Sequence, residues 1–232
     1  LPARIRSIFE LALGTWQAWR LLKQLRPDAV VGFGGYASVP TMMAATFTTT
    51  ATAIHEQNAL LGRANRLLAK RVKAIATSFA DTRGLPEDAD QTVTLIGMPV
   101  RAPIAAMSDT AYPDIEGETP LGVLVLGGSQ GATILSEVVP AALAKLPDDL
   151  KVRLDVTQQC RQEDMDKVKV AYSQSGIRAH LATFIDDVPQ RMAKAHLVIS
   201  RAGASTVAEA LAVGRPSILV PYPHAADAHQ TY

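Results

Sequence analysis

A glycine-rich segment joins an apolar run to a helical pattern in the middle of the chain. The segment Gly127–Gly131 has the sequence GGSQG and follows the run Val123–Leu126, whose length and β-branched residues are typical of a buried strand. A turn between a strand and a helix points unpaired backbone N–H groups, and the positive end of the helix dipole, at one place. Such a place favours an anion, and the phosphate of a nucleotide is the natural ligand.

Two other interpretations fit the same five residues. GGSQG also matches G-x-S-x-G, the nucleophile elbow of α/β hydrolases, with Ser129 as the nucleophile. Asp186 and several histidines follow in the chain order that such a triad needs. The third interpretation is a tight turn whose glycines only let the helix pack on its strand. Short glycine motifs match often by chance, so this segment alone leaves all three open.

Polar residues also follow other apolar runs in the second half. Small and hydroxyl-bearing residues occupy positions 200–206, and Glu209 lies one turn further on. Thr206 and Glu209 fit a capping box, in which two side chains satisfy the amides at a helix start. Glu209 could instead accept two hydrogen bonds from a ribose diol, as acidic residues do in dinucleotide sites. A rigid turn with two prolines, at 221–224, presents further polar side chains.

The first half of the chain carries two comparable segments. One is the glycine loop GFGGYAS at 32–38, and the other is the polar run HEQN at 55–58. Four consecutive polar groups are poor core filler, because amides donate and accept hydrogen bonds and His or Glu can move protons. We interpret this cluster as functional. The alternative is that it caps the helix expected to begin near Leu61.

The composition is that of an ordinary globular protein, with 232 residues, 48% hydrophobic and 19% charged. A net charge of +1, without basic blocks interleaved with aromatic residues, gives no case for nucleic-acid binding. The single cysteine, Cys160, excludes an internal disulfide framework. Metal binding is weakly supported, since Asp164 and Asp166 lie among charges spaced as on a solvated helix, and His224 and His229 are poorly spaced for one helix face. We expect neither a metal nor a cofactor.

Short apolar runs alternate with helical patterns along the chain, which predicts βαβ units and parallel sheets. Strands are expected at Ala29–Phe33, Thr52–His55, Ala74–Ser78, Val93–Ile96, Val123–Leu126, Val152–Val156, Arg178–Thr183, Leu197–Ile199 and Ser217–Val220. Helices are expected at Ser7–Leu25, Val39–Phe47, Leu61–Lys70, Thr133–Lys145, Gln162–Ser173, Val188–Ala195, Ser205–Val213 and from about Ala225.

The segment 97–120 has four prolines and no clear period, which is typical of a linker plus a loop. It divides the chain into two βα halves, and we expect an amino-terminal domain at 1–99 and a carboxyl-terminal domain at 100–232. Ligand clefts favour such domain interfaces. The chain begins inside a helical pattern and ends at an apparent helix start, so we expect it to be a fragment and both domains to be incomplete.

The first 26 residues are both basic and aromatic. Arg4, Arg6, Arg20 and Lys23 are interleaved with apolar residues that include two tryptophans. Packing of one helix face into the core is the default explanation. Cations beside tryptophans also suit a membrane surface with anionic lipids.

Taken in order, these loops resemble one family. GFGGYASVP, HEQNALLGRANRLLA, IGMPVR, GGSQGA, FIDDV, SRAGASTVAEA and PYPHAADAHQTY are together similar to the MurG-type enzymes, the UDP-N-acetylglucosamine:lipid I N-acetylglucosaminyltransferases of bacterial peptidoglycan synthesis. The resemblance implies an α/β fold of the GT-B type: two Rossmann-like domains with parallel sheets flanked by helices and a cleft between them. It further implies an inverting, metal-independent transfer to the 4-hydroxyl of the muramyl sugar of lipid I, giving lipid II.

The resemblance also implies roles for residues of the second half. Ser129 and Gln130 should meet the phosphates of UDP, and Arg101 should lie close to them. Glu209 should hold the ribose hydroxyls, and Ile185 should lie against the uracil. UDP-N-acetylglucosamine is therefore the expected donor.

Further roles concern the two sugars. Ala204 and Gln230 should touch the donor sugar, while Glu56 and Asn58 should face the acceptor across the cleft. The sequence lacks the family's glycine-rich amino-terminal loop, which carries a histidine proposed as the general base, and an asparagine expected just beyond Tyr232. We therefore expect the base to lie outside this sequence. The expected location is the cytoplasmic face of the bacterial inner membrane, as a peripheral protein that binds lipid I and anionic lipid.

Overall fold

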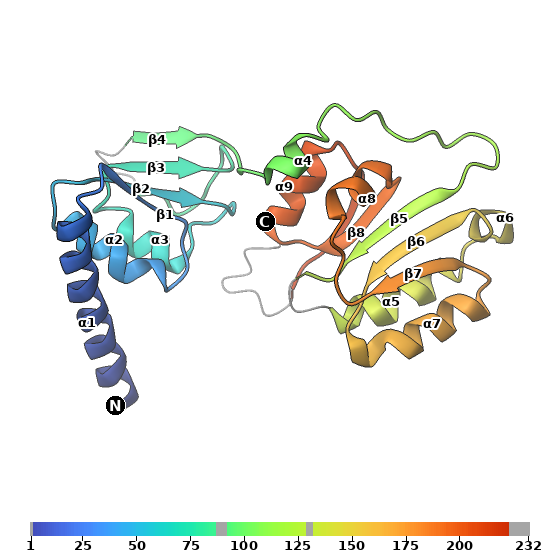
Figure 1. Ribbon diagram of the computed structural model, residues 1–232, viewed down its shortest axis with the longest axis horizontal. Coiled ribbons are helices and arrows are strands. Elements are labelled where there is room, and N and C mark those ends of the chain that lie inside the picture. Colours follow the sequence, from blue (N-terminus) through green and yellow to red (C-terminus); the bar gives the residue numbers. More distant parts are fainter. Residues whose placement is uncertain (1, 87–91, 129–131, 223–232) are drawn as a thin grey trace. The chain divides into compact units, whose positions relative to one another are not determined.

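The computed structural model describes residues 2–86, 92–128 and 132–222. These residues form two compact units, one ending at Met98 and the other beginning at Pro99. Each unit is built around one parallel sheet with helices packed against it (Figure 1). This is the α/β architecture of parallel sheets flanked by helices that the alternating pattern predicts.

The first unit has a sheet whose strands follow in chain order, β1-β2-β3-β4. Helices α2 and α3 cover one face of it, where Met42, Ile54, Leu61 and Ile75 form a buried cluster. The strands are β1 (Ala29–Gly32), β2 (Ala51–Glu56), β3 (Ala74–Thr77) and β4 (Thr92–Leu95). The helices are α1 (Pro2–Leu25), α2 (Ser38–Thr46) and α3 (Arg63–Leu68).

Helix α1 packs on α2 through only part of its length. Leu22 is buried against Ala44 and Ala45 of α2, and Trp19 packs beside them. The amino-terminal half of α1 extends away from α2 (Figure 1) and exposes large apolar side chains. Among the helices that the structure describes, none is both long and apolar enough to cross a membrane.

The second unit has five parallel strands in the order β7-β6-β5-β8-β9. They are β5 (Leu121–Leu126), β6 (Leu154–Gln159), β7 (Arg178–Ala182), β8 (Leu197–Arg201) and β9 (Ser217–Val220). The helices are α4 (Ala102–Ala105), α5 (Thr133–Leu143), α6 (Asp148–Lys151), α7 (Met165–Gln174), α8 (Val188–Lys194) and α9 (Ala204–Ala212), with a 3₁₀ turn at Gln162–Asp164.

Two hydrophobic layers enclose this sheet. Helices α5 and α7 cover one face, where Val125, Leu135 and Tyr172 are buried together. Helices α4 and α8 and the end of α9 pack on the other face, against Leu124 and Val198. Successive residues of β5 point to opposite faces of the sheet, and both faces receive apolar side chains, as expected for a strand that is buried on both sides.

The strand order of the second unit reverses at its middle. The chain leaves β5 for β6 and β7 on one side, then returns to pair β8 with the other side of β5. The register of Leu126 with Ser200 brings the carboxyl ends of β5 and β8 to the same edge. In open α/β sheets, ligands bind in the crevice outside such a switch point.

All nine expected strands are present. The largest shift is at β6, expected at 152–156, because Val152 belongs to the turn after α6 and the strand continues through the polar residues Thr157–Gln159. The short helices α4 and α6 were not expected from the periodicity, since four residues carry no repeat. The helix expected near Ala225 lies outside the described residues.

The proline-rich segment is less of a linker than its composition suggests. From position 110 onward it is tied to the second unit by side chains that bind its backbone carbonyls. Arg215 donates to the carbonyls of residues 110 and 111, His196 bonds the carbonyl of 114, and Arg153 donates to those of 115 and 119. Within the described residues, the chain passes from the first unit to the second between Met98 and Pro99.

Candidate functional site

The glycine turn of the second unit follows β5 as the sequence predicts. The strand ends at Leu126, and Gly128 has φ of +79°, a left-handed conformation that favours glycine. Helix α5 begins at Thr133, and its N-cap Ala132 makes no side-chain cap hydrogen bond. A helix start of this kind, without a side-chain cap, can offer its first amides to a ligand. Ser129 and Gln130, expected at the phosphates, lie outside the described residues.

An ion pair between an exposed arginine and a buried glutamate involves the helix that follows the neighbouring strand β8. Arg101 donates from Nε to Glu209 Oε1 at 2.7 Å and from Nη2 to Oε2 at 3.0 Å, a bidentate arrangement. The Glu209 side chain is 11% exposed and that of Arg101 is 60% exposed. The hydrogen bond to Glu209 raises the pKa of the Arg101 guanidinium. Two residues that the resemblance assigns to the donor site are therefore in direct contact.

The capping-box interpretation of Thr206 and Glu209 is wrong. Helix α9 begins at Ala204 with Gly203 as its N-cap, and no side chain caps it. Glu209 is the sixth residue of the helix, too far along to reach the N-cap amide. Its carboxylate is held by Arg101, 108 residues earlier in the chain, instead of by the helix start.

The remaining donor-side residues are placed in part. Ala204 is the first residue of α9, where the uncapped amides lie. Ile185 is 8% exposed and belongs to the core beneath α8. It also lines an open depression of about 350 Å³ together with the exposed Phe184. Gln230 lies outside the described residues.

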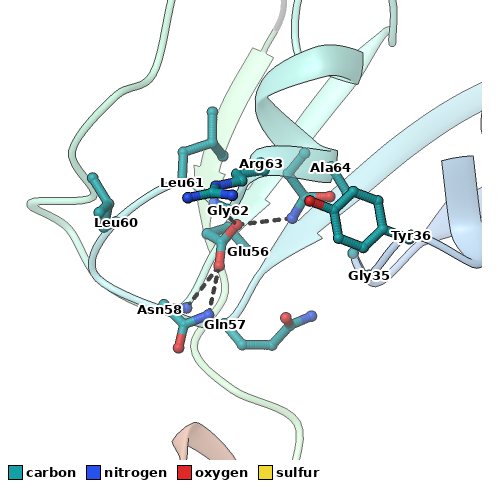
Figure 2. Close-up of a pocket in the computed structure, with 12 residues that line it drawn as sticks. Gly35, Tyr36, Glu56, Gln57, Asn58, Leu60, Leu61, Gly62, Arg63 and Ala64 are labelled. Atoms are coloured by element: carbon teal, nitrogen blue, oxygen red, sulfur yellow. Dashed lines mark hydrogen bonds between the residues drawn. The ribbon is translucent and has the colours of Figure 1, made fainter. Parts of the chain in front are cut away.

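The first unit has its polar cluster at the carboxyl end of β2. Glu56, the last residue of that strand, is 1% exposed. Its Oε1 accepts hydrogen bonds from the backbone N–H and the side-chain amide of Asn58, both at 3.0 Å. Its Oε2 accepts from the Gly62 N–H at 2.9 Å and from Asn65 Nδ2 at 2.8 Å (Figure 2). The carboxylate thus orders the loop 57–62.

This arrangement combines the two interpretations of the HEQN run. Gly62 is the N-cap of α3, so Glu56 does satisfy an amide at a helix start, as the capping alternative predicts. The same loop also lines a pocket of about 240 Å³. Other parts of its wall come from the loop at Gly34 and Gly35, which have φ of +79° and +74°, and from Tyr36. The pocket is lined by residues of both segments that the sequence singles out in this half.

His55 is a structural member of the cluster. It is 2% exposed, and its Nε2 bonds the carbonyl of Gly97 at 3.0 Å while its Nδ1 meets Gln57 Nε2 at 3.2 Å. Gln57 Nε2 also lies 3.0 Å from the carbonyl of Phe33, to which it donates. These bonds fasten the loop after β2 to the neighbouring loop after β1.

Asn65 is a site residue that the sequence analysis missed. It is 2% exposed, and Nδ2 donates to the His55 carbonyl as well as to Glu56. Its Oδ1 is buried, with no hydrogen-bond partner in the structure. The sequence could have identified Asn65 by its spacing, because it lies one helical turn from Leu61 and from Leu68, on the buried side of α3. A polar residue on an apolar helix stripe calls for a specific partner.

Within the described residues, no three His, Cys, Asp or Glu side chains group closely enough to hold a metal ion. His224 and His229 lie outside the part of the chain that the structure describes.

Two α/β units, each with a parallel sheet and polar loops at its strand ends, have the architecture of GT-B glycosyltransferases, the class of the similar solved MurG structure. Residues 1–77 match the N-terminal domain of glycosyltransferase family 28, and residues 122–232 match the C-terminal domain of the same family. The chain belongs to glycosyltransferase family 28.

Several named proteins are similar to this chain over nearly all of its length. The chain is 58% identical over 227 residues to the UDP-N-acetylglucosamine–N-acetylmuramyl-(pentapeptide) pyrophosphoryl-undecaprenol N-acetylglucosamine transferase of Paramagnetospirillum magneticum, covering 98% of this chain and 61% of the relative. It is 49% identical over 231 residues to the protein of that name from Rhodospirillum centenum, covering 100% and 61%. The crystal structure of Acinetobacter baumannii MurG is similar with a TM-score of 0.76 and 33% identity, over 96% of this chain and 61% of that one. The chain thus spans about three fifths of the length of these relatives.

A substitution at Asn65 tests how much its hydrogen bond to Glu56 contributes to the stability of the protein. We predict that Asn65→Asp lowers the free energy of unfolding by about 2–4 kcal/mol near neutral pH, because two carboxylates then meet where a donor is needed. Burial and the neighbouring negative charge raise the pKa of the introduced carboxyl group in the folded state above its value in the unfolded chain. The loss is therefore small below the ordinary carboxyl pKa of about 4, grows as the pH rises above it, and levels off beyond the raised pKa.

Urea unfolding at about pH 4 and about pH 8 measures this loss near the start of its rise and well above it. Gln174→Glu is the matched control, since it makes the same amide-to-acid change at an exposed position. We expect the control to stay within about 0.5 kcal/mol at both pH values. A loss in Asn65→Asp that is equal at the two pH values would contradict the proposed carboxylate pair.

Proposed function

We propose that this chain takes part in the transfer of N-acetylglucosamine from UDP-N-acetylglucosamine to the 4-hydroxyl of the muramyl sugar of lipid I. The observation that carries the proposal is the 58% identity to a transferase of that name across 98% of the chain. Both halves of the chain match domains of one glycosyltransferase family, which supports a role for each in the reaction.

The donor is proposed to bind the second unit at the carboxyl ends of β5 and β8. Three features support this placement: the reversal of strand order, the uncapped start of α5 and the uncapped start of α9. Both helix starts offer amide donors to phosphate or sugar oxygens. Glu209 is then proposed to serve the ribose, because a carboxylate accepts hydrogen bonds from hydroxyl groups.

The chemistry follows from the leaving group. The bond between the anomeric carbon and the UDP oxygen breaks, and UDP leaves with the electron pair. The acceptor hydroxyl forms the new bond from the opposite side, which inverts the anomeric carbon, and a general base accepts its proton. Amides at the start of α5 and the dipole of that helix stabilise the charge that develops on the diphosphate.

The acceptor is proposed to bind the first unit, at the pocket beside Glu56 and Asn58. Glu56 acts there by position: its oxygens accept N–H groups of Asn58, Gly62 and Asn65, which fixes the pocket wall. Asn58 is partly exposed and lines the pocket, so its amide is the group available to a sugar hydroxyl.

Helix α1 is proposed to dock on the cytoplasmic face of the bacterial plasma membrane. Ile8 and Phe9 are 68% and 69% exposed on its projecting half, and Trp16 is also exposed. Arg20 lies over Trp16 at 5.0 Å from the ring centroid, which joins a cation to the apolar surface. Such a surface suits a headgroup layer with anionic lipids, and a lipid acceptor carries its reacting sugar at that layer.

The donor site predicts a selective loss of nucleotide affinity. Glu209→Ala in the intact protein should weaken UDP binding by about 1–3 kcal/mol, because charge-assisted bonds to the ribose are lost. Calorimetry with UDP and with 2′-deoxy-UDP tests this, and the deoxy analogue should lose less. The control is Glu137→Ala, which removes an exposed glutamate paired with Lys167 in the same unit. Equal losses of affinity for both nucleotides would show that Glu209 does not bind the ribose 2′-hydroxyl.

The acceptor site predicts a loss of rate without a loss of donor binding. Asn58→Ala should cut transfer about a hundredfold, since a misplacement of about 1 Å at the reacting hydroxyl has that cost. Glu56→Gln should cut it as well and also lower the melting temperature, because an amide N–H₂ would face N–H donors. UDP affinity should stay unchanged in both. Thr48→Ala, which removes a hydroxyl bonded to Ala45 before β2, is the control. Normal turnover per folded molecule in Asn58→Ala would contradict the proposal that the acceptor binds beside Asn58.

The α1 surface predicts binding to anionic vesicles. Co-sedimentation should fall as salt rises, since each cation near the surface contributes about 1 kcal/mol. Phe9→Asp should weaken it at low salt without unfolding the protein, because that side chain is exposed. Val152→Asp, an equally exposed apolar residue of the second unit, should leave it unchanged. Binding that ignores lipid charge, salt and Phe9 would refute this docking surface.

A further inference from the structure

His55 lies where the loops that follow the four strands of the first unit come together. The residue is 2% exposed. Four segments contact its ring, one from each strand end: Phe33 after β1, Gln57 after β2, Ser78 after β3 and Gly97 after β4. The Phe33 ring packs against it at 5.7 Å between centroids. The imidazole therefore joins the loops along the carboxyl edge of this sheet.

The partners of the two ring nitrogens assign the tautomer of His55. Gln57 Nε2, 3.2 Å from Nδ1, has only hydrogens to offer, so Nδ1 is the acceptor. The Gly97 carbonyl, 3.0 Å from Nε2, can only accept, so Nε2 carries the hydrogen. The ring is thus neutral and relays one hydrogen bond into another, and successive bonds of this kind strengthen each other.

Gly97 is held at both its amide and its carbonyl. It has φ of +75°, a left-handed conformation, and is followed two residues later by Pro99, the first residue of the second unit. Its N–H donates to the Thr77 carbonyl at 3.2 Å, and its carbonyl accepts from His55. The turn through which the chain leaves the first unit is therefore fixed to the ends of β2 and β3. We call residues 97–99 the junction.

The other partner of His55 faces the pocket of the first unit. Gln57 lines this pocket of about 240 Å³, together with Asn58. Its amide nitrogen donates to the Phe33 carbonyl at 3.0 Å and also meets His55 Nδ1. Two consecutive hydrogen bonds, from Gln57 to His55 and from His55 to Gly97, therefore connect the pocket wall to the junction.

We infer that His55 is a positioning residue that couples the acceptor pocket to the junction, and that it acts through Gln57 and Gly97 without touching the substrate. A ligand that orders the Gln57 side chain restricts the imidazole, and the imidazole restricts the Gly97 carbonyl. The burial of His55 fits this role, because at 2% exposure its ring is closed to a ligand. The inference rests on the proposed function, since it takes the acceptor to be the ligand of this pocket.

Hydrogen exchange on the intact protein measures both ends of this connection. Amide exchange is followed at residues 57–62 and at 96–98, with and without a lipid I analogue that carries a short, water-soluble prenyl chain. We expect the analogue to slow exchange at both places. At 96–98 the effect should be about two- to thirtyfold, because coupling through hydrogen-bonded networks has effects of that size.

Two replacements of His55 separate its two hydrogen bonds. In His55→Gln the amide nitrogen takes the place of Nε2, so the donor to Gly97 is kept and the acceptor for Gln57 is lost. In His55→Asn the amide oxygen takes the place of Nδ1, so the acceptor is kept and the donor to Gly97 is lost. We expect His55→Asn to speed exchange at 96–98 in the unliganded protein by about two- to thirtyfold, and His55→Gln to leave it within about twofold. Neither variant should transmit the response to the analogue.

A third variant breaks the connection at the pocket. Gln57→Met keeps the side-chain length and removes the N–H donor to His55. Exchange at 96–98 in the unliganded protein should stay as in the unaltered protein, and the analogue should still slow exchange at 58–62 but not at 96–98. Gln174→Met, which makes the same change at an exposed position of the second unit, is the matched control and should leave every measurement unchanged.

Any of three results would overturn the inference. One is a normal response to the analogue at 96–98 in Gln57→Met. Another is exchange at 96–98 that is no faster in unliganded His55→Asn than in His55→Gln. The third is an analogue that slows exchange at 57–62 but not at 96–98 in the unaltered protein. Failure of the proposed function is recognised separately, because the analogue then leaves 57–62 unchanged in the unaltered protein while His55→Asn still speeds exchange at 96–98.

Discussion

The reversal of strand order between β5 and β8 is the constraint on which the second unit of this molecule depends. Parallel strands need crossover helices, and the chain uses α5 after β5 on one face of the sheet and α9 after β8 on the other. The segments that leave β5 and β8 therefore diverge to opposite faces, and neither covers the edge between them. A glycine turn and the start of α9 meet at this edge because of topology alone, before any ligand is considered.

Two buried carboxylates stand at the strand ends, and they are stabilised in different ways. The donors to Glu56 come from residues within ten positions of it, so the loop after β2 and α3 can form its network locally. The partner of Glu209 is more than a hundred residues away and arrives only when α4 docks through Ile104. An uncompensated buried carboxylate is costly, so folding of the second unit is tied to the segment that precedes its first strand.

The difference between contacts that are local in the sequence and contacts between distant residues explains what the sequence could predict. Buried parallel strands are short apolar runs, and all nine were found from that pattern, along with the polar loops that follow them. The capping box was a plausible local pattern, but the helix starts at Ala204, and the true partner of Glu209 has no signature in spacing. The Arg101 contact, the extension of β6 and the buried amide of Asn65 all depend on tertiary packing. Such packing overrides local propensity.

The glycine turn shows why a single motif was not enough. GGSQG fits phosphate binding, a nucleophile elbow and plain packing because all three use the same backbone turn. A hydrolase would need a histidine near the turn, at the carboxyl edge of the sheet. Of the two histidines after the turn that the structure describes, His180 lies within β7, and His196 lies at the other edge: its Nδ1 accepts the N–H of Gly122 at the start of β5, and its Nε2 donates to the Asp114 carbonyl. Both ring nitrogens are thus committed to backbone groups. Glu209, in the helix that follows β8, is instead held in a bidentate pair with Arg101.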